Sequence, residues 1–171
     1  MDVTSADSVG ASGGSQPPGV LASAATGIVR AIEGQGGDVD RIFGDVGLLP
    51  DIAGSPTARL RLADFCALFE ESARATRNGN FGLWFGNQFA PRDLGLWGYA
   101  AISAPTLGAA LECLVRLFRY HQESSLMRLV DDPDGLVRLE YRIVAPSIVE
   151  RRQDAELSLG MFLNVMRECC G

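Results

Sequence analysis

The chain reads PRDLGLWGYA over residues 91–100 and SAPTLGAAL over residues 103–111, and no other stretch of the sequence is as informative. Glycines at positions 95 and 98 allow two backbones to approach closely. Trp97 and Tyr99 each bring a large apolar ring with one polar group. The stretch holds no pair of acid and base groups suited to catalysis. We therefore expect a packed junction or a ligand pocket here.

A long amphipathic helix is predicted directly after this stretch. Thr106 is a favourable N-cap, and apolar positions recur at a spacing of four, three, four and three residues, at Leu107, Leu111, Leu114, Phe118 and His121. His121 is the only histidine, which excludes a catalytic triad and a site with several histidines. We first interpret His121 as a core histidine that is hydrogen-bonded within the protein. The alternatives are contact with a ligand, acid–base chemistry or a single bond to haem.

Outward from this centre, the pattern predicts helices over residues 20–32, 39–46, 62–76, 81–89 and 95–103. The helix over 62–76 is expected to turn Glu70, Glu71 and Arg74 outward. Segments 125–130 and 136–144 flank a turn of Asp, Pro and Gly, and the second alternates with period two, which indicates a β-hairpin.

A final helix over 147–168 is predicted to pack on this hairpin. Its expected inner stripe is Ala155, Leu159, Phe162, Val165, Met166 and Cys169. The predicted fold class is α+β: a mostly helical domain with a small antiparallel sheet, the hairpin near 125–144, packed by the C-terminal helix.

Composition restricts the function. The net charge of −6 argues against direct binding of nucleic acid. All 15 basic residues are arginine, so Schiff-base chemistry by lysine is excluded. Residues 1–19 are rich in Ser, Gly and Pro and predict a disordered leader before one domain at 20–171. The sequence shows neither a membrane-spanning apolar run nor an export signal, so we expect a cytoplasmic protein with reduced cysteines.

Several short segments, in this order and spacing, are similar to a known family: residues 42–43, 47–50, 61–62, 80–83, 94–99 and 103–111. Through them the chain resembles the N-terminal, arabinose-binding-like sensor domain of AraC-type bacterial transcription regulators. The resemblance implies a sensing and oligomerisation domain, followed in such regulators by two helix-turn-helix units that bind DNA. Those units are missing from this sequence, so we expect a truncated sensor domain at 20–171.

The expected partners are a small-molecule effector of unknown identity and a second copy in a homodimer, with DNA reached only through the missing C-terminal domain. No cofactor, metal or catalytic residue is expected. The predicted ligand-binding residues are Trp97, Tyr99, Phe118 and His121. Two alternatives remain open. One is an oligomerisation module without a ligand, in which the aromatics are pure core. The other is a sensor that uses its single histidine for haem or a small molecule.

Overall fold

The computed structural model describes residues 17–171. In chain order its elements are β1 (Gly19–Leu21), η1 (Ala22–Ala25), α1 (Ile28–Gly34), α2 (Val39–Asp45), η2 (Pro50–Gly54), β2 (Arg59–Arg61), α3 (Leu62–Ala75), α4 (Phe81–Gln88), η3 (Pro91–Leu94), α5 (Leu96–Ile102), α6 (Leu107–His121), β3 (Ser125–Asp131), β4 (Val137–Ile143) and α7 (Arg152–Cys170). The predicted α+β class is confirmed, with two small antiparallel sheets among these helices. Residues 1–16 of the expected leader lie outside the described residues, whereas Gly19 already belongs to β1.

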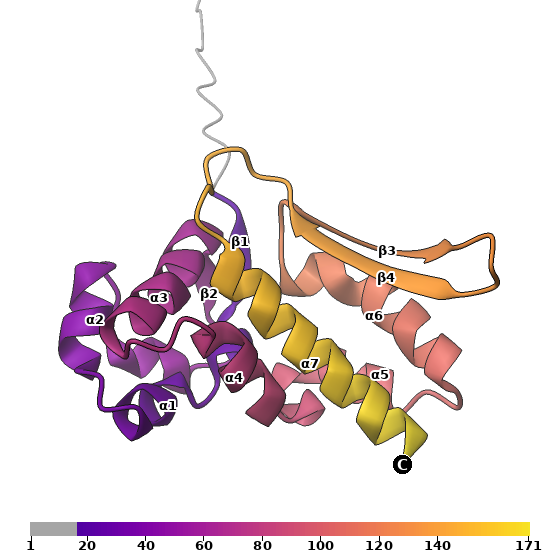
Figure 1. Ribbon diagram of the computed structural model, residues 1–171, viewed down its shortest axis with the longest axis horizontal. Helices are drawn as coiled ribbons and strands as arrows, with labels where there is room; N and C mark the ends of the chain where they lie inside the picture. The colour runs from indigo at the N-terminus through magenta and orange to yellow at the C-terminus, as the bar shows by residue number, and fades with distance from the viewer. Residues whose placement is uncertain (1–16) are drawn as a thin grey trace, which may run out of the picture.

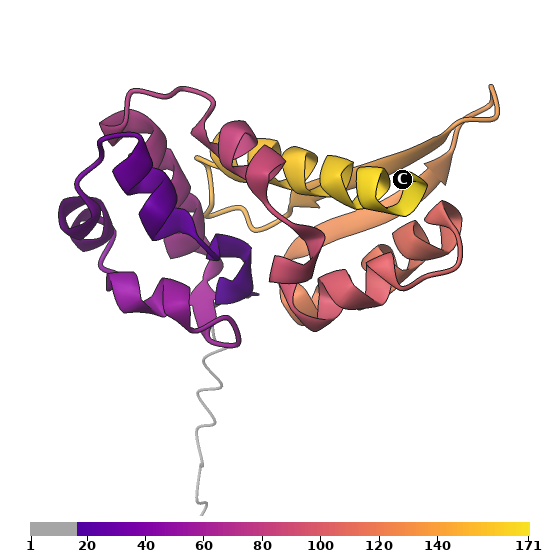
Figure 2. The same ribbon diagram turned by 90° about the horizontal axis from the view of Figure 1, so that it is seen from below.

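The helices form two groups on either side of a central pair. Helices α1–α3 and the β1–β2 sheet lie on one side, and α5, α6 and the β3–β4 hairpin lie on the other (Figure 1). Helices α4 and α7 pack against each other between the groups, and the view from below shows the same arrangement (Figure 2). The hairpin pairs Ser125 with Ile143 and Asp131 with Val137 at its two ends, as its alternating pattern predicted.

Glycines make the contact between α4 and α7 unusually close. A Cβ atom on Gly86 would overlap the carbonyl of Leu157, and a Cβ on Gly160 would lie 2.6 Å from the carbonyl carbon of Gly86. Atoms cannot approach so closely, so only hydrogen fits at these two positions. The helices are therefore in backbone contact, with the Phe69 and Phe85 rings packed in the core beside them at 5.5 Å between centroids.

Polar side chains of α7 also satisfy both ends of α4. The side-chain oxygen of Gln153 accepts a hydrogen bond from the Gly82 amide at 2.7 Å, at the start of α4. At its other end, the Asn164 amide donates to the carbonyls of Gly86, Asn87 and Phe89 at 2.9–3.1 Å. Since helix ends leave backbone groups without partners, these two residues complete α4 and fix its position on α7.

The predicted helix over 20–32 is wrong in its first half. Val20 lies in β1, which pairs with Leu60 of β2, and the α-helix begins only at Ile28, after Gly27 with φ of +87°. The strand is three residues long, and its partner lies far along the chain. A local apolar pattern therefore could not distinguish it from a buried helix.

The predicted stripe of the last helix is wrong in its first part. α7 begins at Arg152, Ala155 is exposed and Leu159 is 60% exposed, whereas Leu157 and Met161 are buried. Gly160 must face α4, and this contact decides which face turns inward. Val165 and Phe162 are buried as expected.

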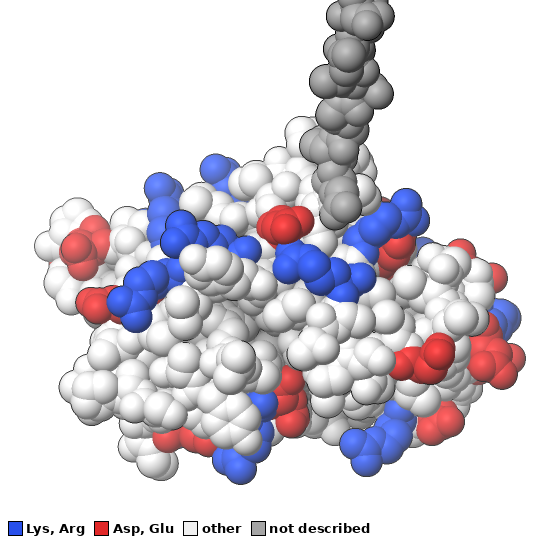
Figure 3. Space-filling view, turned by 180° about the vertical axis from the view of Figure 1, so that it is seen from behind, with Lys and Arg blue, Asp and Glu red and all other residues white. Residues whose placement is uncertain are grey.

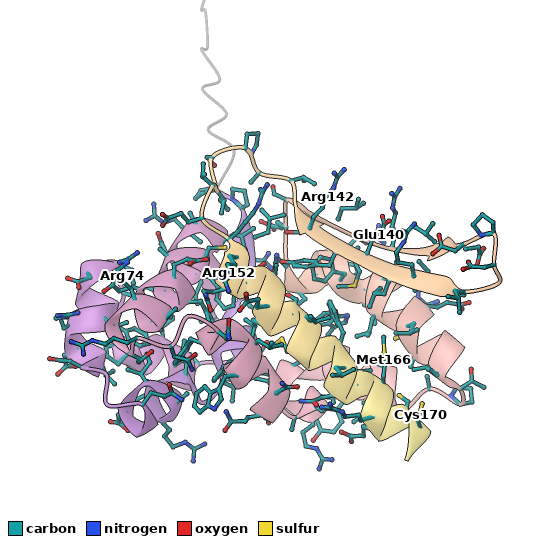
Figure 4. The ribbon with its side chains drawn as sticks, in the orientation of Figure 1. Arg74, Glu140, Arg142, Arg152, Met166 and Cys170 are labelled. Atoms are coloured by element: carbon teal, nitrogen blue, oxygen red, sulfur yellow. The ribbon has the colours of Figure 1, made fainter. Side chains whose placement is uncertain are left out.

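Glu71, expected to point outward, is buried. It forms ion pairs with Arg74 and with Arg41 of α2, which compensate its charge. Other ion pairs lie at the surface or close to it: Arg152 pairs with the half-buried Glu156 at 2.7 Å, and Glu140 of β4 pairs with Arg128 at 2.7 Å (Figure 4). None of the helices described is both long and apolar enough to cross a membrane.

Candidate functional site

A cavity of about 550 Å³ lies where the N-terminal segment meets η3, α5 and α6. Its size suits a small organic ligand, since such sites occupy about 300–1,000 Å³. Almost all of its lining is apolar or aromatic. The lining residues are Leu21, Ser23, Pro56, Thr57, Leu94, Gly95, Leu96, Trp97, Tyr99, Leu117, Tyr120 and His121.

The N-terminal segment reaches this place through backbone pairing. Val20 of β1 bridges to Gln122, directly after α6, and the Glu123 amide donates to the Gly19 carbonyl at 2.9 Å. On the other side, the Ser23 amide donates to the Pro56 carbonyl at 3.0 Å. Ser23 and His121 thereby come to the same cavity from distant parts of the chain.

Trp97 forms the inner wall of the cavity. Its indole N–H donates to the Leu114 carbonyl at 3.0 Å, so its polar group is satisfied within the protein. The ring stacks on His121 at 4.4 Å between centroids and meets Phe118 at 5.4 Å. Gly98 permits this position, because a Cβ there would overlap the Pro91 carbonyl of η3. Gly95 has a different role from the one expected: it faces open space, and its φ of +67° starts α5.

Two buried polar atoms at the cavity have no hydrogen-bond partner in the described part of the chain: His121 Nδ1 and Ser23 Oγ. His121 is 3% exposed and Ser23 is 2% exposed. Leaving such an atom unpaired costs about 1–3 kcal/mol, and native proteins rarely tolerate it. The interpretation of His121 as a hydrogen-bonded core residue is therefore wrong for Nδ1.

His121 is neutral at physiological pH. Burial lowers its pKa to about 3, and the positive charge of Arg59 acts in the same direction. A neutral imidazole has one nitrogen that donates and one that accepts. The residues that line the cavity are therefore uncharged at neutral pH. The two unpaired atoms are themselves buried and lie behind the cavity surface.

A hydrogen-bonded chain continues from α6 into α7, next to the cavity. The Gln122 amide donates to the hydroxyl of Tyr141 on β4, and this hydroxyl donates to Asp154 on α7, each at 2.7 Å. Burial raises the pKa of Asp154 to about 6, and the hydrogen bond from Tyr141 opposes this rise. Burial and the nearby Asp154 raise the pKa of Tyr141, so its hydroxyl stays protonated. This chain joins the wall of the cavity to the hairpin and the last helix.

Three of the four predicted ligand-binding residues line the cavity: Trp97 and His121 inside, and Tyr99, 52% exposed, at the rim. Phe118 lies behind them, buried edge-on against Tyr141. Sequence reasoning missed Ser23 and Thr57. No local signal could have found them, because their position depends on the pairing of β1 and β2.

The other hollows considered are smaller than this cavity and include charged side chains. Two further hollows of about 420 and 400 Å³ include charged side chains such as Arg30 and Arg59. Within residues 17–171, no group of three or more His, Cys, Asp or Glu is placed to hold a metal ion. On the face opposite to Figure 1, uncharged residues occupy the centre of the surface and charged ones lie around it (Figure 3).

Comparison with known proteins identifies the family. A search of curated proteins found no match. A protein-family comparison matches residues 36–171, most of the chain, to the family described as the arabinose-binding domain of AraC transcription regulators, N-terminal. The matched region includes Trp97 and His121 but begins after Ser23. The chain therefore belongs to the family of N-terminal arabinose-binding domains of AraC transcription regulators.

Proposed function

We propose that residues 20–171 form a domain that binds a small-molecule effector in the cavity beside Trp97 and His121, self-associates, and controls a DNA-binding domain of a cytoplasmic transcription regulator. The observation that carries this proposal is the cavity of about 550 Å³, whose lining is largely apolar and aromatic. A small molecule with apolar surface gains free energy when it leaves water for such walls. The lining of the described site supports binding of a small molecule.

The hydrogen-bonded chain from Gln122 through Tyr141 to Asp154 supports a sensing role. An effector that contacts His121 acts on the residue directly before Gln122, at the end of α6. If the effector binds two arrangements of α6 and α7 with different affinity, it shifts their populations. α7 would then transmit the change.

A thermal-shift screen of metabolites tests the proposal. An effector at about 100 times its Kd adds about 2.7 kcal/mol to the free energy of unfolding and raises Tm. In the variant Leu117→Trp, a larger side chain fills the cavity, and the shift should vanish. The matched control is Leu136→Trp, at an exposed leucine directly before β4 and outside the cavity, which should keep it. Shifts that survive Leu117→Trp would contradict the assignment of the site.

Self-association is proposed on a separate observation. Leu159 and Leu163 of α7 lie one helical turn apart and are 60% and 39% exposed. Native mass spectrometry should show a dimer that Leu159→Glu weakens. A stable dimer without any ligand-dependent shift in Tm would instead favour the ligand-free oligomerisation module. A Soret band in the purified protein would favour the haem sensor.

A further inference from the structure

From the lining of the cavity, we infer the chemical class of its ligand: an uncharged, largely apolar molecule with few hydroxyl groups, bound against Leu94, Trp97 and Leu117. This inference rests on the proposed function and adds the class of ligand to it. It departs from the sugar in the family description.

The lining of the cavity is uncharged, which disfavours a charged ligand. Of the residues described at this cavity, none is charged at neutral pH, because burial keeps His121 in its neutral form. Arg59, the nearest cation to affect His121, is paired with Glu123 at 2.8 Å. A carboxylate or ammonium group that entered would lose its hydration and find no partner of opposite charge.

The lining of the cavity also offers few polar atoms, which disfavours a ligand with many hydroxyl groups. A sugar has a hydroxyl on nearly every carbon, and each one that leaves water needs a partner inside the protein. Most of the cavity walls are aliphatic or aromatic, among them Leu94, Trp97 and Leu117. The side-chain hydroxyls at the cavity surface are those of the exposed residues Thr57, Tyr99 and Tyr120, because Ser23 Oγ is buried behind the wall. Such walls favour a ligand with a large apolar surface and few hydroxyl groups.

A matched pair of fluorescent probes tests this inference on the 171-residue chain. N-phenyl-1-naphthylamine is uncharged and has one N–H group, and 8-anilinonaphthalene-1-sulfonate adds a sulfonate to the same rings. We expect the uncharged probe to bind at least about tenfold more tightly, because the cavity cannot compensate the buried charge. L-Arabinose at millimolar concentration should not displace it.

Variants locate the probe. His121→Phe keeps a ring against Trp97 but removes the nitrogen, and Ser23→Ala removes the hydroxyl. Because Ser23 Oγ and His121 Nδ1 are buried behind the cavity wall, neither variant should change the affinity of the uncharged probe much. Leu117→Trp fills the cavity and should weaken that probe at least about tenfold. Trp84 lies in a different hollow, so Trp84→Phe should leave the affinity for the uncharged probe unchanged. In that variant Trp97 is the remaining tryptophan, and the bound probe should quench its fluorescence.

The outcomes distinguish an error in the ligand class from an error in the proposed function. Tighter binding of the sulfonate or of L-arabinose, abolished by Leu117→Trp, would overturn the ligand class and leave the cavity as an effector site. Binding of the uncharged probe that Leu117→Trp does not weaken would also overturn the inference, as would no binding at all. The proposed function itself fails only if the metabolite screen shows no shift that depends on Leu117.

Discussion

The α4–α7 contact and the cavity beside α6 differ in how tightly they are packed and in how well their polar groups are paired. At α4–α7, glycines bring backbones together, and Gln153 and Asn164 satisfy both ends of α4. At the cavity, about 550 Å³ is left unfilled, and His121 Nδ1 and Ser23 Oγ have no described partner. The first arrangement maximises stability. The second leaves apolar side chains open to a cavity and polar atoms unpaired behind it, a departure from best packing of the kind found at functional sites.

The contrast predicts where substitutions will matter most. At α4–α7 any added atom should be costly, because the backbones already touch. At the cavity, removing a polar atom or adding apolar volume should cost little or even stabilise the empty protein. Four measurements of the free energy of unfolding examine this contrast, in order of decreasing effect.

Gly86→Ala should have the largest effect. The new methyl would overlap the backbone carbonyl of Leu157, so α4 and α7 must move apart. We expect a loss of about 3 kcal/mol, at the upper end for overpacking. Gly108→Ala on the exposed side of α6 is the control, with a change below about 1 kcal/mol and a tendency to stabilise. Equal effects in urea unfolding would show that the α4–α7 contact is not specially tight.

Tyr141→Phe tests the polar chain between the two regions. It removes the hydroxyl that donates to Asp154 at 2.7 Å and leaves a buried carboxylate without that partner. The expected loss is about 2 kcal/mol, and the pKa of Asp154 should rise above about 6. Tyr120→Phe, at a tyrosine that is 62% exposed, should change stability by less than about 0.5 kcal/mol. A loss no greater than that control would mean that water replaces the hydroxyl.

His121→Phe should change how stability depends on pH. The pKa of His121 is about 3 when folded and about 6.5 when unfolded, so the folded state binds fewer protons between these values. Its contribution to stability is present above pH 6.5 and is lost, by about 1.4 kcal/mol per pH unit, as the pH falls toward 3.

Unfolding of wild type and His121→Phe at pH 7, 6 and 5 measures this difference. Asp154, with its pKa raised to about 6, contributes with the opposite sign between about pH 4 and 6. It is present in both proteins and cancels in the comparison. The variant should be more stable at every pH, and its advantage should grow on acidification. An advantage that stays constant would place the histidine in contact with water.

Arg152→Ala should have the smallest effect. Its ion pair with Glu156 lies at the edge of the α4–α7 contact, and the arginine side chain is 66% exposed (Figure 4). Exposed pairs contribute about 0–1 kcal/mol, so the expected loss is below about 1 kcal/mol. A larger loss would mean that charge, and not backbone packing, holds the start of α7.

Local patterns predicted most elements but not their partners. The cap at Thr106 accepts from the Ala109 amide at 3.2 Å, and the helix after it ends at His121. The hairpin follows from its alternating residues and its turn. The pattern failed at β1, a strand too short to have a readable period, and on α7, where contact with α4 decided which face is buried.

Only part of the candidate site could be predicted from the sequence, because local patterns do not show which distant segments meet. Trp97 and His121 lie on predicted helices, and their aromatic and imidazole rings drew attention without any structure. Ser23 carries no such signal. Its role depends on backbone bonds that join β1 to the end of α6 and the loop before β2.

The sequence by itself determined the α+β class, most helix boundaries, the hairpin and the resemblance to AraC-type sensor domains, since these depend on residue periodicity, caps and turns within short windows. Only the tertiary structure decided that Ser23 and His121 share one cavity, that their polar atoms lack partners there and that His121 is uncharged. These properties arise from burial and from contacts between distant segments, which no local pattern encodes.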